Sequence, residues 1–447
     1  MNRREFLRGA AGAGAALALS SGMGAILTAC GGGGGSKKST KLELWAFDAN
    51  RVDWQQKMLD QFMKNQGGKL ESLTVTTIPS DQLYDKLQTA ILAGTGAPDL
   101  VDLHIYFWTR FMKDDKLLAK FVNLTDMVGK EKENLVAGSG VDPWTWQGKI
   151  YGVCNELNPV LMYTRFDLFQ KAGITEPITD WEKDFIDKGK ALKAKTGVNI
   201  ISLNGTTFQD LYILGAQRGG TFFDDKGNFV GDQDVMVNTL QFMQDLVYTH
   251  QIAMVSPLDP AGRQGPPYYA AMQEGKFATA SGAPWFQGFM KANAKDVAGK
   301  WHIQKQPRWS DSQIESVTYG GTGMGILAST GSKDVAWEFV KYANLSNDGP
   351  LLAYKTHNLF PTYKLSWTNE SLKQPDPYFD NQKPGDFITD AAGKMGPFRT
   401  SPFFSEVVAD PNSIVARLAI QPVMQNKKKP KDAMADVVAE AKKIMGK

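Results

Sequence analysis

Carboxylates close to aromatic residues are the side chains of this sequence best suited to chemistry. Asp48 follows a short apolar alternation, Glu156 lies five residues after Tyr151, and Asp210 precedes Tyr212. Two carboxylates about 5–10 Å apart would suit the acid and base of a glycosidase. Carboxylates beside aromatic rings would equally suit a sugar, because they bind its hydroxyl groups while the rings cover its apolar faces.

Signatures of other catalytic chemistry are missing from the sequence. It contains no GxSxG elbow, no GxxxxGK[ST] loop, no HExxH and no CxxC, and the glycines of 320–325 do not have the GxGxxG spacing. Asp102 and His104 would share one face of a strand, but no third group accompanies them. We therefore predict no catalytic residue, no metal site and no cofactor.

Composition points to an ordinary globular protein. The chain has 447 residues, 42% of them hydrophobic and 22% charged, with a formal net charge of +3. This charge is too small to predict a nucleic-acid groove, and the length suggests two or three domains. The surroundings of Cys30 and Cys154 differ too much to favour a disulfide, and we expect Cys154 to be a small buried residue.

The first forty residues resemble an export signal. Arg3, Arg4 and Arg8 precede an uncharged stretch at 10–29 that is rich in alanine and glycine. The adjacent arginines are typical of a twin-arginine signal. Residues 27–30 read Leu-Thr-Ala-Cys, which resembles the lipobox of bacterial lipoproteins.

This reading predicts a signal peptide at 1–29, a lipidated Cys30 and a flexible tether at 30–40. The protein would be held by its lipid on the extracytoplasmic face of the membrane. A transmembrane anchor with a bystander cysteine is the alternative.

Strands and helices alternate after residue 40. The patterns predict strands at 41–47, 73–78, 99–103 and 198–203, and helices at 53–63, 81–93, 163–172, 181–195, 235–250, 335–345 and 432–445. Such alternation is typical of an α/β fold with parallel sheets. Because no linker divides the chain after residue 40, we expect two lobes that are connected several times.

Six segments in order resemble one protein family. They are 83–99 (LYDKLQTAILAGTGAPD), 149–169 (KIYGVCNELNPVLMYTRFDLF), 172–181, 271–278, 320–326 (GGTGMGI) and 336–340 (AWEFV). The sequence is identified by them as a member of the bacterial extracellular solute-binding proteins of ABC transporters, in the sugar-binding group that includes maltose-binding protein.

The resemblance implies a two-lobed periplasmic-binding-protein fold of type II, with a ligand cleft between the lobes. Lobe one would comprise 41–154 and 324–360, and lobe two 155–323 and 361–447. Three hinge crossings are expected, near 151–156, 320–326 and 359–362.

The resemblance also implies which residues line the cleft. Ligand contacts are expected from Trp45, Asp48, His104, Tyr106, Glu156, Asp210, Tyr212, Trp285, Tyr319, Gly320, Gly321 and Phe404. Trp45 could instead be a core strand residue and Glu156 a surface residue, whereas Trp108 is expected to pack under the next helix. Burial in the core is the alternative for the aromatic residues of lobe two.

The function implied is capture of a carbohydrate and its delivery to an ABC permease by a monomeric, lipid-anchored protein that is not an enzyme. Two alternatives remain open. One is a lipoprotein glycosidase with a cleft carboxylate pair, and the other is an adhesin or structural lipoprotein.

Overall fold

The computed structural model describes residues 41–47, 49–66, 70–256 and 265–446. Residues 39–447 form one compact unit. The signal peptide, the lipidated Cys30, the tether and the ligand contact Asp48 are predictions that lie outside the described residues.

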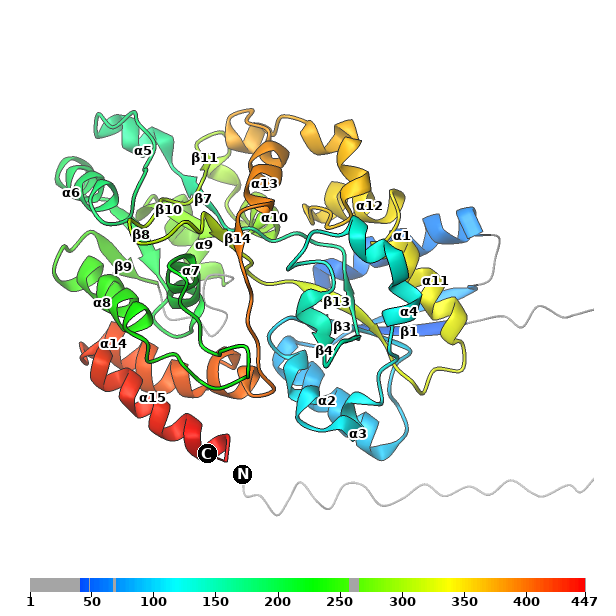
Figure 1. Cartoon of the computed structure of the whole chain (residues 1–447). Coiled ribbons are helices and arrows are strands. Elements are labelled where there is room, and N and C mark those ends of the chain that lie inside the picture. The colour runs from blue at the N-terminus through cyan, green and yellow to red at the C-terminus, as the bar shows by residue number, and fades with distance from the viewer. Residues whose placement is uncertain (1–40, 48, 67–69, 257–264, 447) are drawn as a thin grey trace, which may run out of the picture. The chain divides into compact units, whose positions relative to one another are not determined.

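A mixed five-stranded sheet carries the first part of the chain (Figure 1). Its strands, in spatial order, are β2 (Ser72–Thr77), β1 (Lys41–Ala46), β3 (Leu100–His104), β13 (Thr322–Ile326) and β6 (Val153–Cys154). Strand β1 pairs in parallel with β2 and β3, whereas β13 runs antiparallel to β3 and β6. Within this sheet, the parallel arrangement predicted from the alternation therefore holds for β1, β2 and β3 but not for β13 and β6.

A second five-stranded sheet is built from the middle of the chain. Its strands, in spatial order, are β11 (His302–Gln304), β7 (Leu161–Thr164), β10 (Phe277–Gly282), β8 (Asn199–Leu203) and β9 (Ala253–Val255). Strand β7 is antiparallel to both of its neighbours, while β8 is parallel to β10 and β9. Two short two-stranded sheets pair β12 (Ser316–Val317) with β14 (Met395–Gly396) and β4 (Thr145–Trp146) with β5 (Lys149–Ile150).

Four longer helices belong to the first sheet's part of the chain. They are α1 (Ala49–Gln66), α2 (Ser80–Ala93), α11 (Lys333–Asn344) and α12 (Asp348–His357). Helix α1 packs on β2, α11 and α12, and helix α11 packs on β13. Helix α2 ends because Gly94 adopts a left-handed conformation (φ 71°), which glycine reaches without steric cost.

Helices of the second sheet's part are more numerous. They are α5 (Phe166–Lys171), α6 (Asp184–Thr196), α7 (Gln209–Gln217), α8 (Asp234–Tyr248), α9 (Pro266–Gln273), α10 (Pro284–Asn293), α13 (Pro384–Ala392), α14 (Gln421–Asn426) and α15 (Pro430–Ile444). Four of them begin with proline, whose fixed φ suits the first helical position.

Short helical segments complete the chain. They are η1 (Trp108–Lys113), α3 (Asp115–Leu118), α4 (Thr125–Val128), η2 (Gly129–Asn134), η3 (Asp142–Trp144), η5 (Lys295–Val297), η6 (Lys364–Thr368), η7 (Glu370–Lys373), η8 (Pro377–Phe379), η9 (Ser405–Ala409) and η10 (Ala416–Ile420). The last two of these are π-helical turns.

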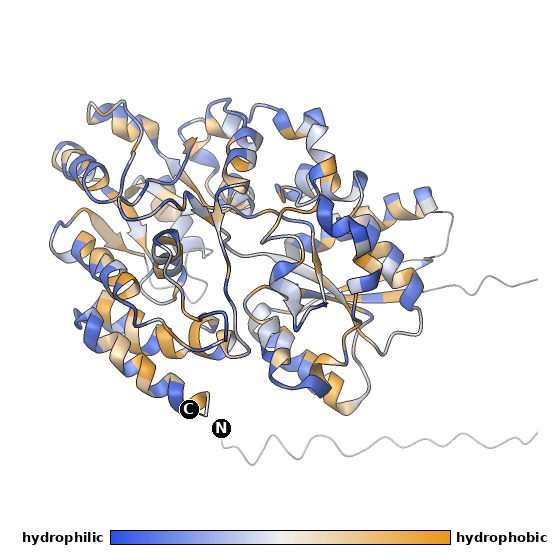
Figure 2. Ribbon diagram, viewed as in Figure 1, coloured by the Kyte–Doolittle hydropathy of each residue, from blue (hydrophilic) through white to orange (hydrophobic). Residues whose placement is uncertain are grey.

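The apolar core runs through both parts of the unit. Figure 2 shows hydrophilic and hydrophobic residues alternating along the helices, as expected when one face of each helix packs against a sheet. One buried cluster is continuous from Trp45 and Val101 of the first sheet to Leu203 and Ile201 of the second. None of the helices that the structure describes is long and apolar enough to span a bilayer.

Most predicted elements match observed ones, with one clear exception. The helix predicted at 163–172 begins only at Phe166, because Leu161–Thr164 forms strand β7. Tyr163 is fully buried there between β10 and β11. Pairing on both sides of this short apolar run decides its conformation, which periodicity alone does not reveal.

Candidate functional site

Three segments of chain pass between the two sheets, and backbone hydrogen bonds join the first of them to each of the other two. Residues 155–160 lead from β6 to β7, residues 318–321 lead from β12 to β13, and residues 358–363 follow α12. The Tyr319 N–H donates to the Asn158 carbonyl (2.9 Å), and the Leu157 N–H donates to the Phe360 carbonyl (2.6 Å). The first crossing therefore lies a few residues after the predicted position, and the other two are close to it.

Glycine is required where the second crossing enters β13. Gly320 and Gly321 have φ angles of 77° and 135°, a region that residues with a side chain rarely adopt. A Cβ atom on Gly323 would lie 2.6 Å from the Trp144 ring, so Trp144 packs directly against the strand backbone. Trp144 is fixed there because its Nε1–H donates to the Leu103 carbonyl (2.7 Å).

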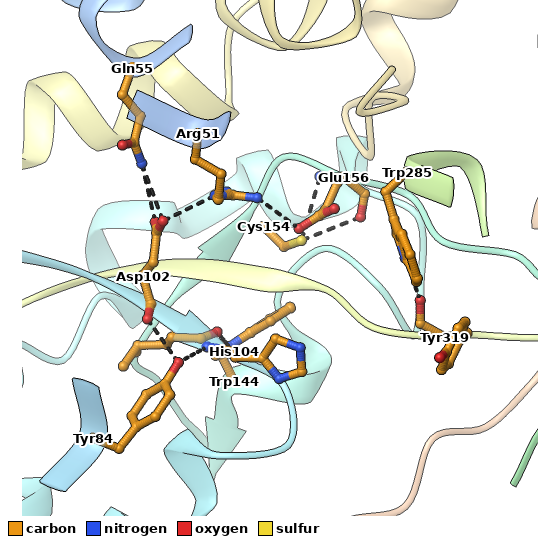
Figure 3. A network of polar contacts seen from close by, with 11 residues as sticks. Arg51, Gln55, Tyr84, Asp102, His104, Trp144, Cys154, Glu156, Trp285 and Tyr319 are labelled. Carbon is orange, nitrogen blue, oxygen red and sulfur yellow. Dashed lines mark hydrogen bonds and ion pairs between the residues drawn. The ribbon is translucent and has the colours of Figure 1, made fainter. Parts of the chain in front are cut away.

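A buried ion network joins α1, β3 and the first crossing (Figure 3). Arg51 donates from Nε to Asp102 Oδ2 (3.0 Å) and from Nη1 to Glu156 Oε1 (3.3 Å). Gln55 donates to the same oxygen of Asp102 (3.2 Å). Arg51, Asp102 and Glu156 are exposed by only 6%, 0% and 4%. Glu156, predicted to contact the ligand, thus lies at the crossing but binds Arg51.

Burial controls the charge states of this region. It raises the pKa of Asp102, although Arg51 and Gln55 favour the charged carboxylate. It lowers the pKa of His104 to about 3, and the positive charge of Arg51 acts in the same direction. His104 Nδ1 accepts a hydrogen bond from the Tyr106 N–H (3.3 Å), which fits a neutral ring protonated on Nε2.

His104 and Asp102 do not form an acid–base pair. The Asp102 carboxylate faces Arg51, while the His104 ring contacts the rings of Phe47, Tyr106 and Phe107 at centroid distances of 5.3, 5.0 and 5.2 Å. Tyr84 links only their backbones, donating to the Asp102 carbonyl and accepting from the His104 N–H. The His104 ring is therefore part of an aromatic cluster.

Tyr106 is the point where aromatic residues from the two parts of the unit meet. Its ring stacks on Phe404 (5.6 Å, 15°). It also makes tilted or edge contacts with Phe208, Phe398 and Tyr212 at 5.2, 6.0 and 6.5 Å. The predicted ligand contacts Tyr106, Tyr212 and Phe404 are thus brought together.

Two hydroxyl groups in this cluster bind the second crossing. The Tyr106 hydroxyl accepts from the Gly320 N–H (3.0 Å), and the Tyr212 hydroxyl donates to the Thr318 carbonyl (2.8 Å). Lys113 on η1 and Glu406 on η9 add an ion pair beside the cluster. Residues of the first sheet's part therefore hold the second part through aromatic, polar and ionic contacts.

Trp285 and Tyr319 form a second aromatic group at the crossing (Figure 3). Their ring centroids are 5.4 Å apart, and Trp285 Nε1 donates to the Tyr319 carbonyl (3.0 Å). Trp285 occupies the first turn of α10, because Pro284 starts the helix. The indole is only half-buried, whereas Tyr319 is 6% exposed.

Trp45 and Asp210 have partners of their own. Trp45 is 3% exposed; it donates to Glu43 (2.8 Å) and lies under the Lys86 ammonium (4.6 Å). Asp210 accepts from the Asn204 N–H (2.6 Å) in the loop before α7. Trp108 is buried and Cys154 is a buried free cysteine, as the sequence predicts.

Six further residues join the site in the folded protein, although no sequence pattern predicts them. They are Arg51, Gln55, Trp144, Asn158, Phe208 and Phe398. Arg51 follows the first strand closely and Asn158 lies two residues after Glu156, so proximity to selected residues was an available signal for both. Phe398 lies six residues before Phe404, which its ring contacts at 5.5 Å, so the same signal was available for it, whereas Phe208 lies far along the chain from Tyr106.

The arrangement offers aromatic rings, buried amides and an ion network in which one guanidinium is engaged by two carboxylates. Such groups bind a polar, uncharged molecule with apolar faces. Among the residues that the structure describes, no three histidine, cysteine, aspartate or glutamate side chains gather as metal ligands.

Comparison with known proteins finds both relatives in sequence and solved structures with a similar fold. Two relatives named arabinooligosaccharide-binding protein match it. The one from Halalkalibacterium halodurans is 26% identical over 351 residues, which cover 76% of this chain and 75% of the relative. The one from Bacillus subtilis is 23% identical over 425 residues, which cover 93% of this chain and 96% of the relative. The solved structure of maltose-bound T. maritima MalE3 has a TM-score of 0.73 at 19% identity, covering 90% of this chain and 99% of that one.

The fold is accordingly the two-lobed α/β fold of maltose-binding-protein-like proteins. A family model described as bacterial extracellular solute-binding protein matches residues 48–346, which is well over half of the 447 residues. The chain belongs to the family of bacterial extracellular solute-binding proteins.

Proposed function

We propose that this protein is a lipid-anchored extracytoplasmic receptor that binds a carbohydrate and delivers it to an ABC import permease. The family consists of binding proteins, and two relatives that match most of the chain are named for arabinooligosaccharides. An oligosaccharide is therefore the ligand class that we propose.

The observation that carries the proposal is the aromatic cluster at Tyr106. Pyranose and furanose rings have apolar faces that pack on aromatic rings, and their hydroxyl groups need donors and acceptors nearby. Tyr106, Tyr212 and Phe404 provide such rings beside the crossing segments, while Glu156 and Asn158 provide polar groups on one of these segments. A purely structural lipoprotein would not need both kinds of group at the junction of two lobes.

Charge in the same region favours a neutral ligand. Arg51 is buried between two carboxylates, Asp102 and Glu156, so its charge is already balanced within the protein. A phosphate or a sugar acid approaching this network would find the guanidinium already engaged and would face two acidic groups. We infer that the ligand is an uncharged saccharide.

We propose that the two lobes have the bounds predicted from the sequence. Lobe one comprises 41–154 and 324–360, lobe two comprises 155–323 and 361–447, and the ligand is held between them. The proposed ligand contacts are those predicted above, namely Trp45, Asp48, His104, Tyr106, Glu156, Asp210, Tyr212, Trp285, Tyr319, Gly320, Gly321 and Phe404. Contacts from both lobes are what would let a ligand favour a closed arrangement.

A thermal-shift screen tests the proposal. The protein from residue 39 onward is heated with arabino-oligosaccharides, lactose, maltose and glucuronic acid as an acidic comparison. A saccharide at 100 times its Kd adds about 2.7 kcal/mol to the free energy of unfolding, so the neutral sugar that binds should raise the melting temperature clearly.

The same samples distinguish binding from catalysis. The saccharide recovered after long incubation should be chemically unchanged. No stabilisation by any carbohydrate would refute the receptor, and recovery of shortened sugars would favour the glycosidase alternative.

Anchoring is tested separately. Cys30→Ala removes the thiol that the lipid would modify, so the variant should be released from the membrane fraction while retaining the saccharide affinity of the wild type. An acylated Cys30→Ala protein in the membrane fraction would refute the assignment.

A further inference from the structure

Asn158 has a buried amide that the folded chain does not satisfy. The residue is 1% exposed, and within the described part of the chain neither Oδ1 nor Nδ2 has a hydrogen-bond partner. Only its backbone carbonyl is used, by the Tyr319 N–H. Buried polar groups without partners are rare in proteins because each carries a desolvation cost.

The backbone of Gly321 passes close to this amide. A Cβ atom on Gly321 would lie 3.5 Å from Asn158 Nδ2 and 3.3 Å from the Trp144 ring. A Cβ atom on Gly320 would lie 3.2 Å from Trp285 Nε1. The amide is therefore adjacent to the glycine pair, which is itself flanked by two tryptophan rings.

Asn158 is not alone on its segment. Asn155, on the same crossing and 1% exposed, also has an Nδ2 atom without a partner among the described residues. Glu156 between them is held by Arg51. Two unsatisfied amides on one crossing segment are more than an isolated packing defect would explain.

We infer that Asn158 is a ligand-binding residue, with its amide recognising hydroxyl groups of the saccharide. Nδ2 donates to one hydroxyl oxygen while Oδ1 accepts from a neighbouring hydroxyl, since an amide presents a donor and an acceptor side by side. Adjacent hydroxyls on a sugar ring match this pair. The inference rests on the proposed function and adds a specificity-determining residue to that site.

Asn158→Leu separates this role from a structural one. The variant keeps a similar side-chain volume and removes the unsatisfied amide, so the unliganded protein should melt at the wild-type temperature or above it. Its affinity for the arabino-oligosaccharide, lactose or maltose that binds the wild type should fall by about tenfold or more, as measured by calorimetric titration.

Asn344→Leu is the matched control. Asn344 is also 1% exposed, but its amide donates to the Val340 carbonyl (2.7 Å) within α11. This variant should melt at a lower temperature and keep the wild-type affinity. Asn158→Ser serves as a second variant if leucine prevents folding, because it removes the paired donor and acceptor with a smaller group and should show the same loss of affinity.

The outcomes are distinct. Unchanged affinity in Asn158→Leu or Asn158→Ser would overturn the inference and indicate that the amide binds a buried water molecule. The proposed function would then still stand. If none of the three saccharides binds the wild-type protein, the proposed function fails and this inference fails with it.

Discussion

Tyr106 and Phe404 stack almost face to face, with ring centroids 5.6 Å apart and an angle of 15° between the planes. Tyr106 follows β3 of the first sheet, whereas Phe404 directly precedes η9 near the C-terminus. Their exposed fractions are 5% and 1%. One aromatic contact thus joins the two parts of the protein at the proposed site.

This stacking should be energetically coupled. In a double-mutant cycle of Tyr106→Ala and Phe404→Ala, we expect a coupling free energy of about 0.5–1.5 kcal/mol, as for other aromatic pairs. The measurement is urea denaturation of the wild type, both single variants and the double variant.

Phe62 and Phe339 provide the reference pair, because they pack within the first part of the chain at 5.7 Å. Their coupling should be similar. A coupling near zero for Tyr106 and Phe404, with normal coupling in the reference pair, would show that the two rings are apart in the free protein.

Removal of Arg51 should destabilise the protein strongly. Arg51→Met leaves Asp102 and Glu156 buried without their cation, which typically costs about 3–5 kcal/mol. Lys57→Met is the control, since Lys57 pairs with Asp53 on the exposed face of α1 and should contribute less than about 1 kcal/mol. Equal losses in the two variants, measured by urea denaturation at pH 7, would contradict the network.

His104 should make stability depend on pH. Its pKa is about 3 in the folded protein and 6.5 in the unfolded chain, so only the unfolded chain takes up a proton between these values. The contribution of the neutral His104 ring to the free energy of unfolding is therefore fully present above pH 6.5 and is lost as the pH falls towards 3. Between pH 7 and pH 5 the wild type should lose about 1–2 kcal/mol more than His104→Gln.

The measurement is the free energy of unfolding of both proteins at each pH. The carboxylates are common to both, so their contribution cancels in the difference. Parallel pH profiles would mean that the imidazole is readily protonated in the folded protein.

Trp285→Ala should weaken binding more than folding. The indole is half-buried beside the glycine pair, and loss of such a platform costs about 1–3 kcal/mol by analogy with base stacking, or about tenfold to a hundredfold in Kd. Trp301→Ala is the control, because Trp301 is fully buried and its truncation should lower stability by about 3–5 kcal/mol.

Affinity in the folded fraction separates the two tryptophans. The affinity should fall for Trp285→Ala and stay at the wild-type value for Trp301→Ala. The opposite pattern would remove Trp285 from the site.

Local patterns predicted those elements whose signals are local. Strand β1 and helix α2 match their predicted bounds within one residue, because alternation and the Gly94 turn lie within the segments themselves. The helix predicted at 163–172 instead begins at Phe166, because residues 163 and 164 belong to β7, whose conformation depends on two strands distant in sequence. The antiparallel entry of β13 into the first sheet depends on long-range pairing in the same way.

The site was predictable only in part, for a similar reason. Tyr106 and Glu156 could be selected from their positions after strands and motifs. The pairing of Glu156 with Arg51, and the stacking of Tyr106 on Phe404, arise from segments brought together by folding. Asn158 matters because its amide lacks a partner among the described residues, a property that exists only in three dimensions.

A crystal structure of the protein bound to the saccharide that stabilises it most would show whether the ligand lies between the two lobes. We expect the sugar between the two sheets, in contact with Tyr106 or His104 from one part and with Trp285, Tyr212 or Phe404 from the other. A sugar bound on the outer surface, or by residues of one lobe alone, would contradict the proposal that the ligand is held between the two lobes.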